Sequence, residues 1–298
     1  MTILQTENLS KHFGKVKALK SVSMDVREGE VFGFIGPNGS GKSTTIRILL
    51  GMLSPTGGEA TVFGMDAKNQ AVDIHKRIAY VPGEVNLWPN LTGGEVIDLL
   101  MSFHGVKNEG RKKELIRDFQ FDPSKKCRAY SKGNRQKVAL IAALAIEPDL
   151  YIFDEPTSGL DPLMERTFQK YVKDARAEGK SVLLSSHILS EVEQLCDRVG
   201  IIRDGEIIET GSLTDLRHLT RTNLYVETSH TLENLEQWEG VHAVEQEEAG
   251  WSFQVDTEKM DTVMAELSTF GIRKIESAPP TLEDLFMRHY EGSGGGEE

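Results

Sequence analysis

VFGFIGPNGSGKSTT, residues 31–45, is the stretch of this 298-residue sequence that decides its fold. It starts with an apolar run, VFGFI, that is typical of a buried strand, and the segment TTIRILLGML that follows the loop is typical of a helix. Between them lies a glycine-rich loop of the pattern G-x-x-x-x-G-K-S. Strand, loop and helix in this order predict an α/β fold with a P-loop, the backbone cradle in which nucleotide phosphates bind.

The residue types in the loop suit contact with phosphate. Glycine accepts positive φ, so the backbone can turn several N–H groups toward one anion, and the helix start adds its positive dipole end. Lys42 supplies charge for the β- and γ-phosphates, and the Ser43 hydroxyl is a hard ligand for Mg²⁺. A glycine turn with a surface lysine is the alternative. The sequence predicts nucleotide contacts by Gly36, Asn38, Gly39, Gly41, Lys42, Ser43 and Thr44.

A second apolar strand is predicted at residues 150–153, and two acids follow it directly. Asp154 is placed to hold the water shell of Mg²⁺ together with Ser43. Glu155 is placed to polarise the water that attacks the γ-phosphate. Two surface acids that cap a strand are the alternative. With the P-loop upstream, the pair predicts hydrolysis of a Mg²⁺-bound nucleoside triphosphate, with Ser43 and Asp154 as metal ligands and Glu155 as a catalytic residue.

Kinases, GTPases, helicases and transport ATPases all have P-loops, so further motifs must separate these classes. Tyr130–Gln136, YSKGNRQ, precedes the apolar helix KVALIAALAI. Ser131 and the amide of Gly133 stand at the predicted helix start, which is a natural anion site, although a plain helix cap is the alternative. With the P-loop and the acidic pair, this segment resembles the signature sequence of the ATP-binding-cassette (ABC) family. The resemblance covers residues 1 to about 220.

The resemblance implies further roles. In this family the signature binds the γ-phosphate of ATP held by the opposite subunit, so Ser131 and Gly133 are expected to act across a dimer that sandwiches two nucleotides. Asp161 in SGLD is similar to the D-loop, which crosses the dimer seam. His187 follows the predicted strand SVLLSS and matches the catalytic histidine that contacts the γ-phosphate, and Phe13 matches the aromatic residue that stacks on adenine. A structural histidine and a core phenylalanine are the alternatives.

Two positions depart from the family's usual pattern. After the predicted strand at 78–82 the family has a glutamine that reaches Mg²⁺ and the attacking water, but this chain has Gly83 followed by Glu84. Water or Glu84 could take over that role, or the coupling of hydrolysis to the membrane subunit could run through Trp88 and its neighbours. The sequence does not choose among these alternatives. Lys132 stands where the commonest signature has glycine. The YSKG form resembles the branch of drug, sodium and lipid exporters.

Three predicted helices between about 84 and 145 resemble the family's helical subdomain, whose groove receives a helix of the membrane subunit. The stretch ILQTENLSKHF and the segment near Thr61 are expected in an antiparallel sheet. With the RecA-like core they make up the nucleotide-binding domain predicted at 1–220. The longest apolar run, Val138–Ile146, is too short to cross a bilayer, and no signal peptide is evident. We therefore expect a cytoplasmic chain, held at the inner face of the membrane by a separate membrane-spanning subunit.

The formal charge of −12 is unevenly distributed. Residues from 221 to the end include 5 basic and 17 acidic residues, so residues 1–220 are neutral, and this shift marks a domain boundary near residue 220. An acidic total argues against a nucleic-acid partner. The basic cluster Arg111–Arg128 is most simply a solvated helix and loop, and contact with lipid headgroups is the alternative. Cys127 and Cys196 have no metal-binding spacing and suit a reducing compartment.

The acidic segment is predicted as a domain at 221–291 with a flexible tail at 292–298. Strands are expected at 224–228, 241–247, 251–256 and 272–277, and helices at 232–238 and 258–270. This βαββαβ order predicts a small ferredoxin-like α+β fold. A capping box at Thr281 and Asp284 predicts a last helix that carries Leu282, Leu285, Phe286 and His289. Its TLEDLF resembles the ending of daunorubicin-resistance-type exporter ATPases, whose extra domain helps pair or regulate subunits, and a plain stabilising cap is the alternative.

The favoured function is the ATPase subunit of an exporter of drugs, lipids or ions, paired as a homodimer or heterodimer. A cassette ATPase that acts on ribosomes or DNA is one alternative. Such chains usually have two nucleotide sites or a long coiled-coil insertion, and this sequence has neither. An importer ATPase is the other alternative, and it more often ends in a β-rich appendage. The choice of exporter therefore depends on YSKG and TLEDLF, and the transported substrate is not indicated.

Overall fold

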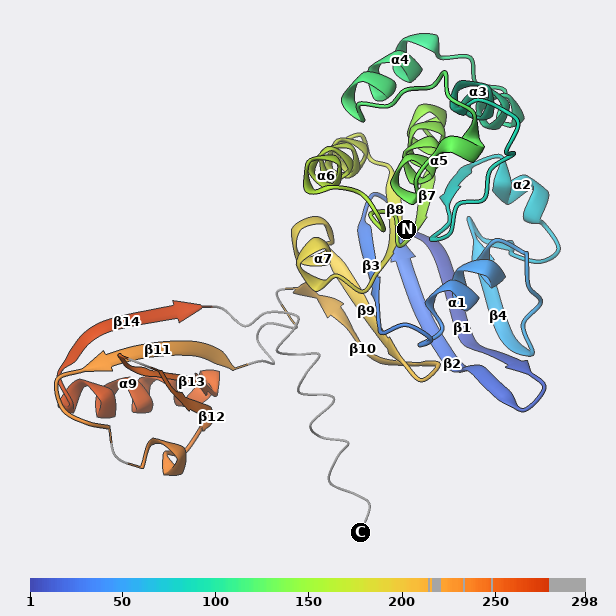
Figure 1. Ribbon diagram of the computed structural model, residues 1–298. Helices are drawn as coiled ribbons and strands as arrows, with labels where there is room; N and C mark the ends of the chain where they lie inside the picture. The colour runs from blue at the N-terminus through green and yellow to red at the C-terminus, as the bar shows by residue number, and fades with distance from the viewer. Residues whose placement is uncertain (214, 216–220, 233, 248, 279–298) are drawn as a thin grey trace. The chain divides into compact units, whose positions relative to one another are not determined.

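The computed structural model describes residues 1–213, 215, 221–232, 234–247 and 249–278 (Figure 1). The chain divides into two compact units, Met1–Thr210 and Gly211–Glu298. This division falls ten residues before the point at which the net charge changes. In the described part of the chain, no helix is both long and apolar enough to cross a membrane.

Ten strands of the region 1–213 form one sheet in the order β5-β4-β1-β2-β10-β9-β3-β8-β7-β6. Strands β9, β3, β8, β7 and β6 pair in parallel, whereas β1, β2, β4 and β5 pair antiparallel, as expected for the segments at the N-terminus and near Thr61. The strands are β1 Thr2–Phe13, β2 Val16–Arg27, β3 Val31–Ile35, β4 Gly57–Val62, β5 Met65–Asp66, β6 Ile78–Val81, β7 Leu150–Asp154, β8 Ser181–Ser186, β9 Arg198–Arg203 and β10 Glu206–Ser212.

Helices alternate with these strands along the chain, and α3, α4 and α5 group together at one end of the unit (Figure 1). They form the three predicted helices of the region 84–146. Thr92 and Glu95 start α3 with a reciprocal capping box, in which each side chain accepts the other residue's backbone N–H. The helices are α1 Lys42–Leu49, α2 Ala71–His75, α3 Gly93–Phe103, α4 Glu109–Asp118, α5 Lys132–Ile146, α6 Pro162–Ala177 and α7 Leu189–Leu195, with a 3₁₀ turn, η1, at Cys127–Ala129.

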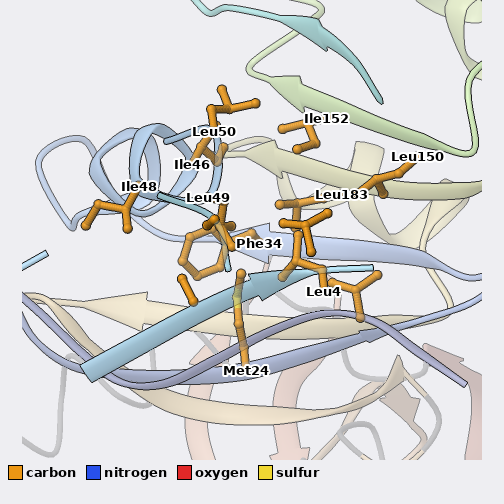
Figure 2. Close-up of a cluster of buried hydrophobic side chains, with 14 of the residues drawn as sticks. Leu4, Met24, Phe34, Ile46, Ile48, Leu49, Leu50, Leu150, Ile152 and Leu183 are labelled. Atoms are coloured by element: carbon orange, nitrogen blue, oxygen red, sulfur yellow. The ribbon is translucent and has the colours of Figure 1, made fainter. Parts of the chain in front are cut away.

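The core of the first unit fixes α1 against the sheet. Strands β3, β7 and β8 are buried along their whole length, as continuous apolar strands of a covered parallel sheet should be. Figure 2 shows Phe34 of β3 surrounded by side chains of α1, β7 and β8, with Leu4 and Met24 below it. Each large apolar side chain buried there contributes about 1.5–3 kcal/mol. The helix that follows the P-loop is therefore held rigidly where the parallel strands end.

The second unit is a four-stranded antiparallel sheet in the order β12-β13-β11-β14. Numbered along the unit, this order is 2-3-1-4, which confirms the predicted ferredoxin-like arrangement. Helix α9, Met260–Thr269, buries Val263 and Leu267, and Met260, Met264 and Phe270 pack beside them on the same face. The strands are β11 Thr222–Thr228, β12 Val241–Gln246, β13 Trp251–Val255 and β14 Ile272–Ala278.

One predicted element of this unit is wrong. The sequence predicts a helix at 232–238, but the described residues of this span, 232 and 234–238, contain only a 3₁₀ turn, η2 at Leu235–Gln237. Asn234 before the turn has a left-handed φ of 56°, and Trp238 after it is extended, so neither end can continue as a helix. Leu232 and Leu235 still reach the core. The helix expected at 258–270 begins with a further 3₁₀ turn, η3 Thr257–Lys259.

The predicted last helix, with Thr281, Asp284 and the apolar residues between them, and the tail at 292–298 lie outside the described residues.

Candidate nucleotide site

The P-loop lies between the buried strand β3 and helix α1, as its sequence predicts. Gly39 and Gly41 have φ of 83° and 115°, which side-chain-bearing residues rarely adopt. No side chain caps α1, and its first amide with a backbone partner is that of Thr45, which donates to the Gly41 carbonyl. The amides of Lys42, Ser43 and Thr44 at the helix start are therefore suited to an anion.

The residues of the loop differ in how far they are exposed to solvent. Asn38 and Gly39 are exposed, whereas Gly36 is buried, and a Cβ there would lie 2.3 Å from the Ile202 carbonyl oxygen. Lys42 is only 5% exposed, and its Nζ donates to the Gly36 carbonyl at 2.6 Å. This ammonium is thus held on the inner side of the loop, where a phosphate would be its natural counter-ion.

Glu155 brings together three parts of the site that are far apart in sequence. Its Oε1 lies 3.4 Å from Lys42 Nζ, and its Oε2 lies 2.8 Å from His187 Nδ1. Glu155 follows β7, Lys42 follows β3 and its loop, and His187 follows β8. Because these strands are parallel neighbours in the sheet, their carboxyl ends meet at one edge.

The backbone of Glu155 is strained at this position. Its φ is 49°, in the left-handed region that costs a residue with a side chain roughly 1–3 kcal/mol. The amide of Glu155 donates to both the carbonyl and the hydroxyl of Ser185 on β8, at 3.0 and 3.2 Å. These two bonds hold the strained turn, which is a geometry typical of functional sites.

The oxygen groups at this edge fit a divalent cation. Asp154 is 4% exposed, and its carboxylate accepts a hydrogen bond from the Ser185 hydroxyl, with no cationic side chain paired to it among the described residues. Ser43 is half-buried on α1, which contacts β7. A carboxylate and a hydroxyl beside a phosphate loop are the hard donors that Mg²⁺ prefers.

Ser131 and Gly133 lie at the start of α5, as predicted. Ser131 is the N-cap, and its hydroxyl accepts the Asn134 amide at 3.3 Å. A Cβ on Gly133 would lie 2.3 Å from the Gly159 carbonyl oxygen, so the helix start and the following loop touch backbone to backbone. Lys132 Nζ donates to the Ser158 hydroxyl at 2.6 Å. The signature and the segment before Asp161 thus form one local cluster.

Asp161 has a clear structural role. It is the N-cap of α6, and its carboxylate accepts the amides of Leu163 and Met164, both at 3.1 Å. Phe13, at the end of β1, is 49% exposed, with Lys11 Nζ 5.0 Å from its ring centroid. An exposed ring at a strand end is free to stack on a flat ligand and is not part of the core.

Gly83 lies next to Asp154 and Glu155 and has no side chain that could contact them. A Cβ at this position would lie 3.1 Å from the Asp154 carbonyl oxygen and 3.6 Å from Glu155 Cβ. Position 83 therefore faces the acidic pair, as the family's glutamine would. Glu84 next to it is exposed.

Glu191 is a buried residue of the site that the sequence did not indicate. It lies on α7, is 5% exposed, and accepts hydrogen bonds from Ser186 at 2.9 Å and Thr157 at 3.4 Å. Burial raises its pKa to about 7, against the lowering effect of these two hydrogen bonds. Its position in LSEVEQL gives no local signal, because the packing of α7 against β8 and α6 buries it.

Comparison with known proteins identifies the class to which this fold and site belong. Residues 19–158 match the family model of the ABC transporter, and residues 211–290 match the C-terminal domain of DrrA1-3-like ATP-binding proteins. The bacitracin transport ATP-binding protein BcrA of Bacillus licheniformis is 31% identical over 96% of this chain and 97% of its own length. The linearmycin resistance ATP-binding protein LnrL of Bacillus subtilis is 36% identical over 72% of this chain and 70% of its own.

A solved structure extends the likeness to three dimensions. The ATP-binding cassette MJ0796, in a dimeric post-hydrolysis state with ADP and phosphate, superposes with a TM-score of 0.65 at 27% identity. The match covers 70% of this chain and 98% of that one. The chain therefore belongs to the ATP-binding proteins of ABC transporters, and it is an ATPase of that family.

Proposed function

We propose that this chain pairs with a second ATPase subunit on binding MgATP and powers a separate membrane-spanning exporter. The observation that carries the catalytic part is the Glu155 carboxylate, which contacts both Lys42 and His187. A base, a phosphate-binding cation and a histidine within reach of one another are what hydrolysis of a γ-phosphate requires.

In this mechanism Glu155 accepts the proton of the attacking water, and His187 orients Glu155 and contacts the γ-phosphate. Lys42 exchanges its loop carbonyls for the β- and γ-phosphates. The backbone amides of Lys42, Ser43 and Thr44 hold the remaining phosphate oxygens, and Phe13 stacks on the adenine. Ser43 and Asp154 would hold Mg²⁺, which when bound supplies charge that stabilises the transferring phosphoryl oxygens.

The signature cluster completes the site from the second subunit. Within the chain, Ser131 and Asp161 cap the helices that follow them, and Gly133 lies against Gly159. Among the described contacts of these three residues, none is with the P-loop. The related cassette MJ0796 was solved as a dimer. We therefore assign Ser131 and Gly133 to the γ-phosphate held by the paired subunit, and Asp161 to the seam between the two chains. Release of phosphate after hydrolysis then reopens the pair.

An apolar cavity of about 230 Å³ in the first unit is suited to the membrane subunit. Trp88 and Phe103, which line it, are 50% and 69% exposed, and helices α3 and α5 form its walls. Exposed aromatic side chains around a groove are typical of a helix-docking site. This site would hold the chain at the cytoplasmic face of the membrane.

The direction of transport is inferred from the relatives. BcrA and LnrL are named for bacitracin transport and linearmycin resistance, and the second unit matches the DrrA-like C-terminal domain. We accordingly propose a nucleotide-binding domain at 1–220, with helical subdomain 84–145, and an accessory domain at 221–291 that serves an exporter.

Glu155→Gln tests the pairing mechanism. This variant keeps the shape of the side chain but loses the base, so ATP should bind without turnover and trap the pair. Size-exclusion chromatography with MgATP should show a dimer for the variant and mostly monomer for wild type. Only monomer in the variant would count against pairing of the isolated chain.

Phe103→Asp tests the docking site separately. Pull-down of the tagged chain from its native membrane in detergent should recover a polytopic membrane protein with wild type and lose it with the variant. ATP hydrolysis by the isolated variant should stay unchanged. Equal recovery with both chains would show that the membrane subunit binds elsewhere.

A further inference from the structure

Within the described part of the chain, Glu191 is the most deeply buried acid that the proposed mechanism does not use. It lies on α7 behind the loops that carry Glu155 and His187, and it has no cationic partner among the described residues. Its Oε2 accepts both of its hydrogen bonds, while its Oε1 is buried without a partner. A carboxyl kept in such surroundings is costly, so its retention points to a role beyond packing.

The hydrogen bonds of Glu191 lead directly to the turn that holds His187. Ser186 donates its hydroxyl to Glu191 at 2.9 Å, and the same hydroxyl oxygen accepts the Ile188 amide at 3.0 Å. Ser186, which precedes His187, is thus bonded to the carboxyl directly, and Ile188, which follows His187, is linked to it through the Ser186 hydroxyl. No side chain caps α7, so this bond to the Ile188 amide also stabilises the helix start.

A second hydrogen bond leads to the segment that follows Glu155. Thr157 donates to Glu191 Oε2 at 3.4 Å. The carboxyl of Glu191 therefore lies at the meeting point of the two loops whose side chains, Glu155 and His187, approach to 2.8 Å. A change at this point would alter the distance between those two groups without touching the P-loop.

We propose that Glu191 is a positioning residue for ATP hydrolysis, which holds the His187 turn and the segment after Glu155 in register. The inference rests on the roles proposed for Glu155 and His187. Glu191 does not contact the nucleotide in this account. Its loss should therefore lower kcat and leave the KM for ATP nearly unchanged.

The ionisation of Glu191 should modulate this role. Several titratable groups face it: Glu155 after β7, Glu165 on α6 and Cys196 after α7, while Arg166 lines the same cavity of about 250 Å³. The two acids favour the protonated form. The carboxylate is the stronger acceptor for Ser186 and Thr157, so the loops should be held more firmly as Glu191 ionises.

The test is steady-state hydrolysis of MgATP by the purified full chain. Glu191→Ala should lower kcat about tenfold or more, with KM within about threefold of wild type, and Glu191→Gln, which keeps an acceptor oxygen, should restore most of kcat. The ratio of wild-type to Glu191→Gln kcat should rise from pH 6 to pH 8, because only the wild type ionises there. Glu178→Gln, at an exposed position after α6, is the matched control.

Further variants separate the possible failures. Ser186→Ala removes the same link without a buried cavity the size of a glutamate, and it should lower kcat in the same way if Glu191→Ala does not fold. The inference would be overturned if Glu191→Ala and Ser186→Ala both kept the wild-type kcat. It would also be overturned if kcat and KM changed together and Glu191→Gln did not restore them. His187→Ala is assayed alongside. If His187→Ala keeps the wild-type kcat, the role proposed for His187 is itself wrong. If His187→Ala loses activity while Glu191→Ala keeps it, only the role of Glu191 is refuted.

Discussion

The edge of the parallel sheet and the start of α5 hold two halves of the candidate site in different ways. At the sheet edge, Lys42, Glu155 and His187 come from three different strands and contact one another directly. At α5, Ser131 and Gly133 contact only their immediate surroundings among the described residues. The first half is thus assembled within the chain. In the proposed mechanism, the second half gains a function only when another chain presents its nucleotide.

The largest expected effect concerns the first half. Glu155→Gln should lower kcat for ATP about 10²–10⁴-fold, since it removes the general base. The KM for ATP should change little, because the P-loop is intact. Hydrolysis at more than a tenth of the wild-type rate would show that another group activates the water.

Gly133→Ala tests the second half of the site, at the start of α5. The new methyl group would meet the Gly159 carbonyl oxygen at 2.3 Å, so the helix start must move away from the loop. We expect kcat to fall about 100-fold through misplacement of the signature, while binding of a fluorescent ATP analogue to the monomer stays at the wild-type level. Gly110→Ala in α4 is the control, because its nearest neighbour lies 3.7 Å away and alanine fits there.

The pH dependence of stability tests the burial of Glu191. Its folded-state pKa is raised from 4.5 to about 7, so the folded chain keeps a proton that the unfolded chain releases between these values. Stability from this group is fully present below about pH 4.5 and is lost as pH rises through 7. Urea unfolding should therefore show Glu191→Gln gaining roughly 2–3 kcal/mol on wild type between pH 4.5 and pH 8. A difference that stays constant with pH would mean that Glu191 titrates normally.

The smallest effect is expected at the adenine. Stacking on an aromatic ring contributes about 1–3 kcal/mol, so Phe13→Ala should raise the KM for ATP about tenfold and leave kcat nearly unchanged. Phe103→Ala removes an exposed ring outside the nucleotide site and should leave both constants unchanged. A lower kcat with unchanged KM in Phe13→Ala would exclude the stacking role.

Much of this architecture could be predicted from sequence, because its signals are local. The P-loop and the acids after β7 are contiguous motifs at strand ends, and apolar periodicity placed α9 and the strands of the second unit. Glu191 could not be predicted in this way, since its burial depends on how α7 packs on β8. The helix expected at 232–238 failed for a similar reason. Leu232, Leu235 and Trp238 have helical spacing, but the left-handed φ of Asn234 limits the segment to one 3₁₀ turn.

The most direct test of the two-half site is to mix two inactive variants. Lys42→Ala disables the first half, and Gly133→Ala disables the second. In a mixed pair, the P-loop of the Gly133→Ala chain faces the intact signature of the Lys42→Ala chain, so one complete site forms. ATP hydrolysis by the mixture should recover to roughly a quarter of the wild-type rate, because half of random pairs are mixed and each has one complete site. A rate no greater than the sum of the two variants alone would contradict a site shared between two chains.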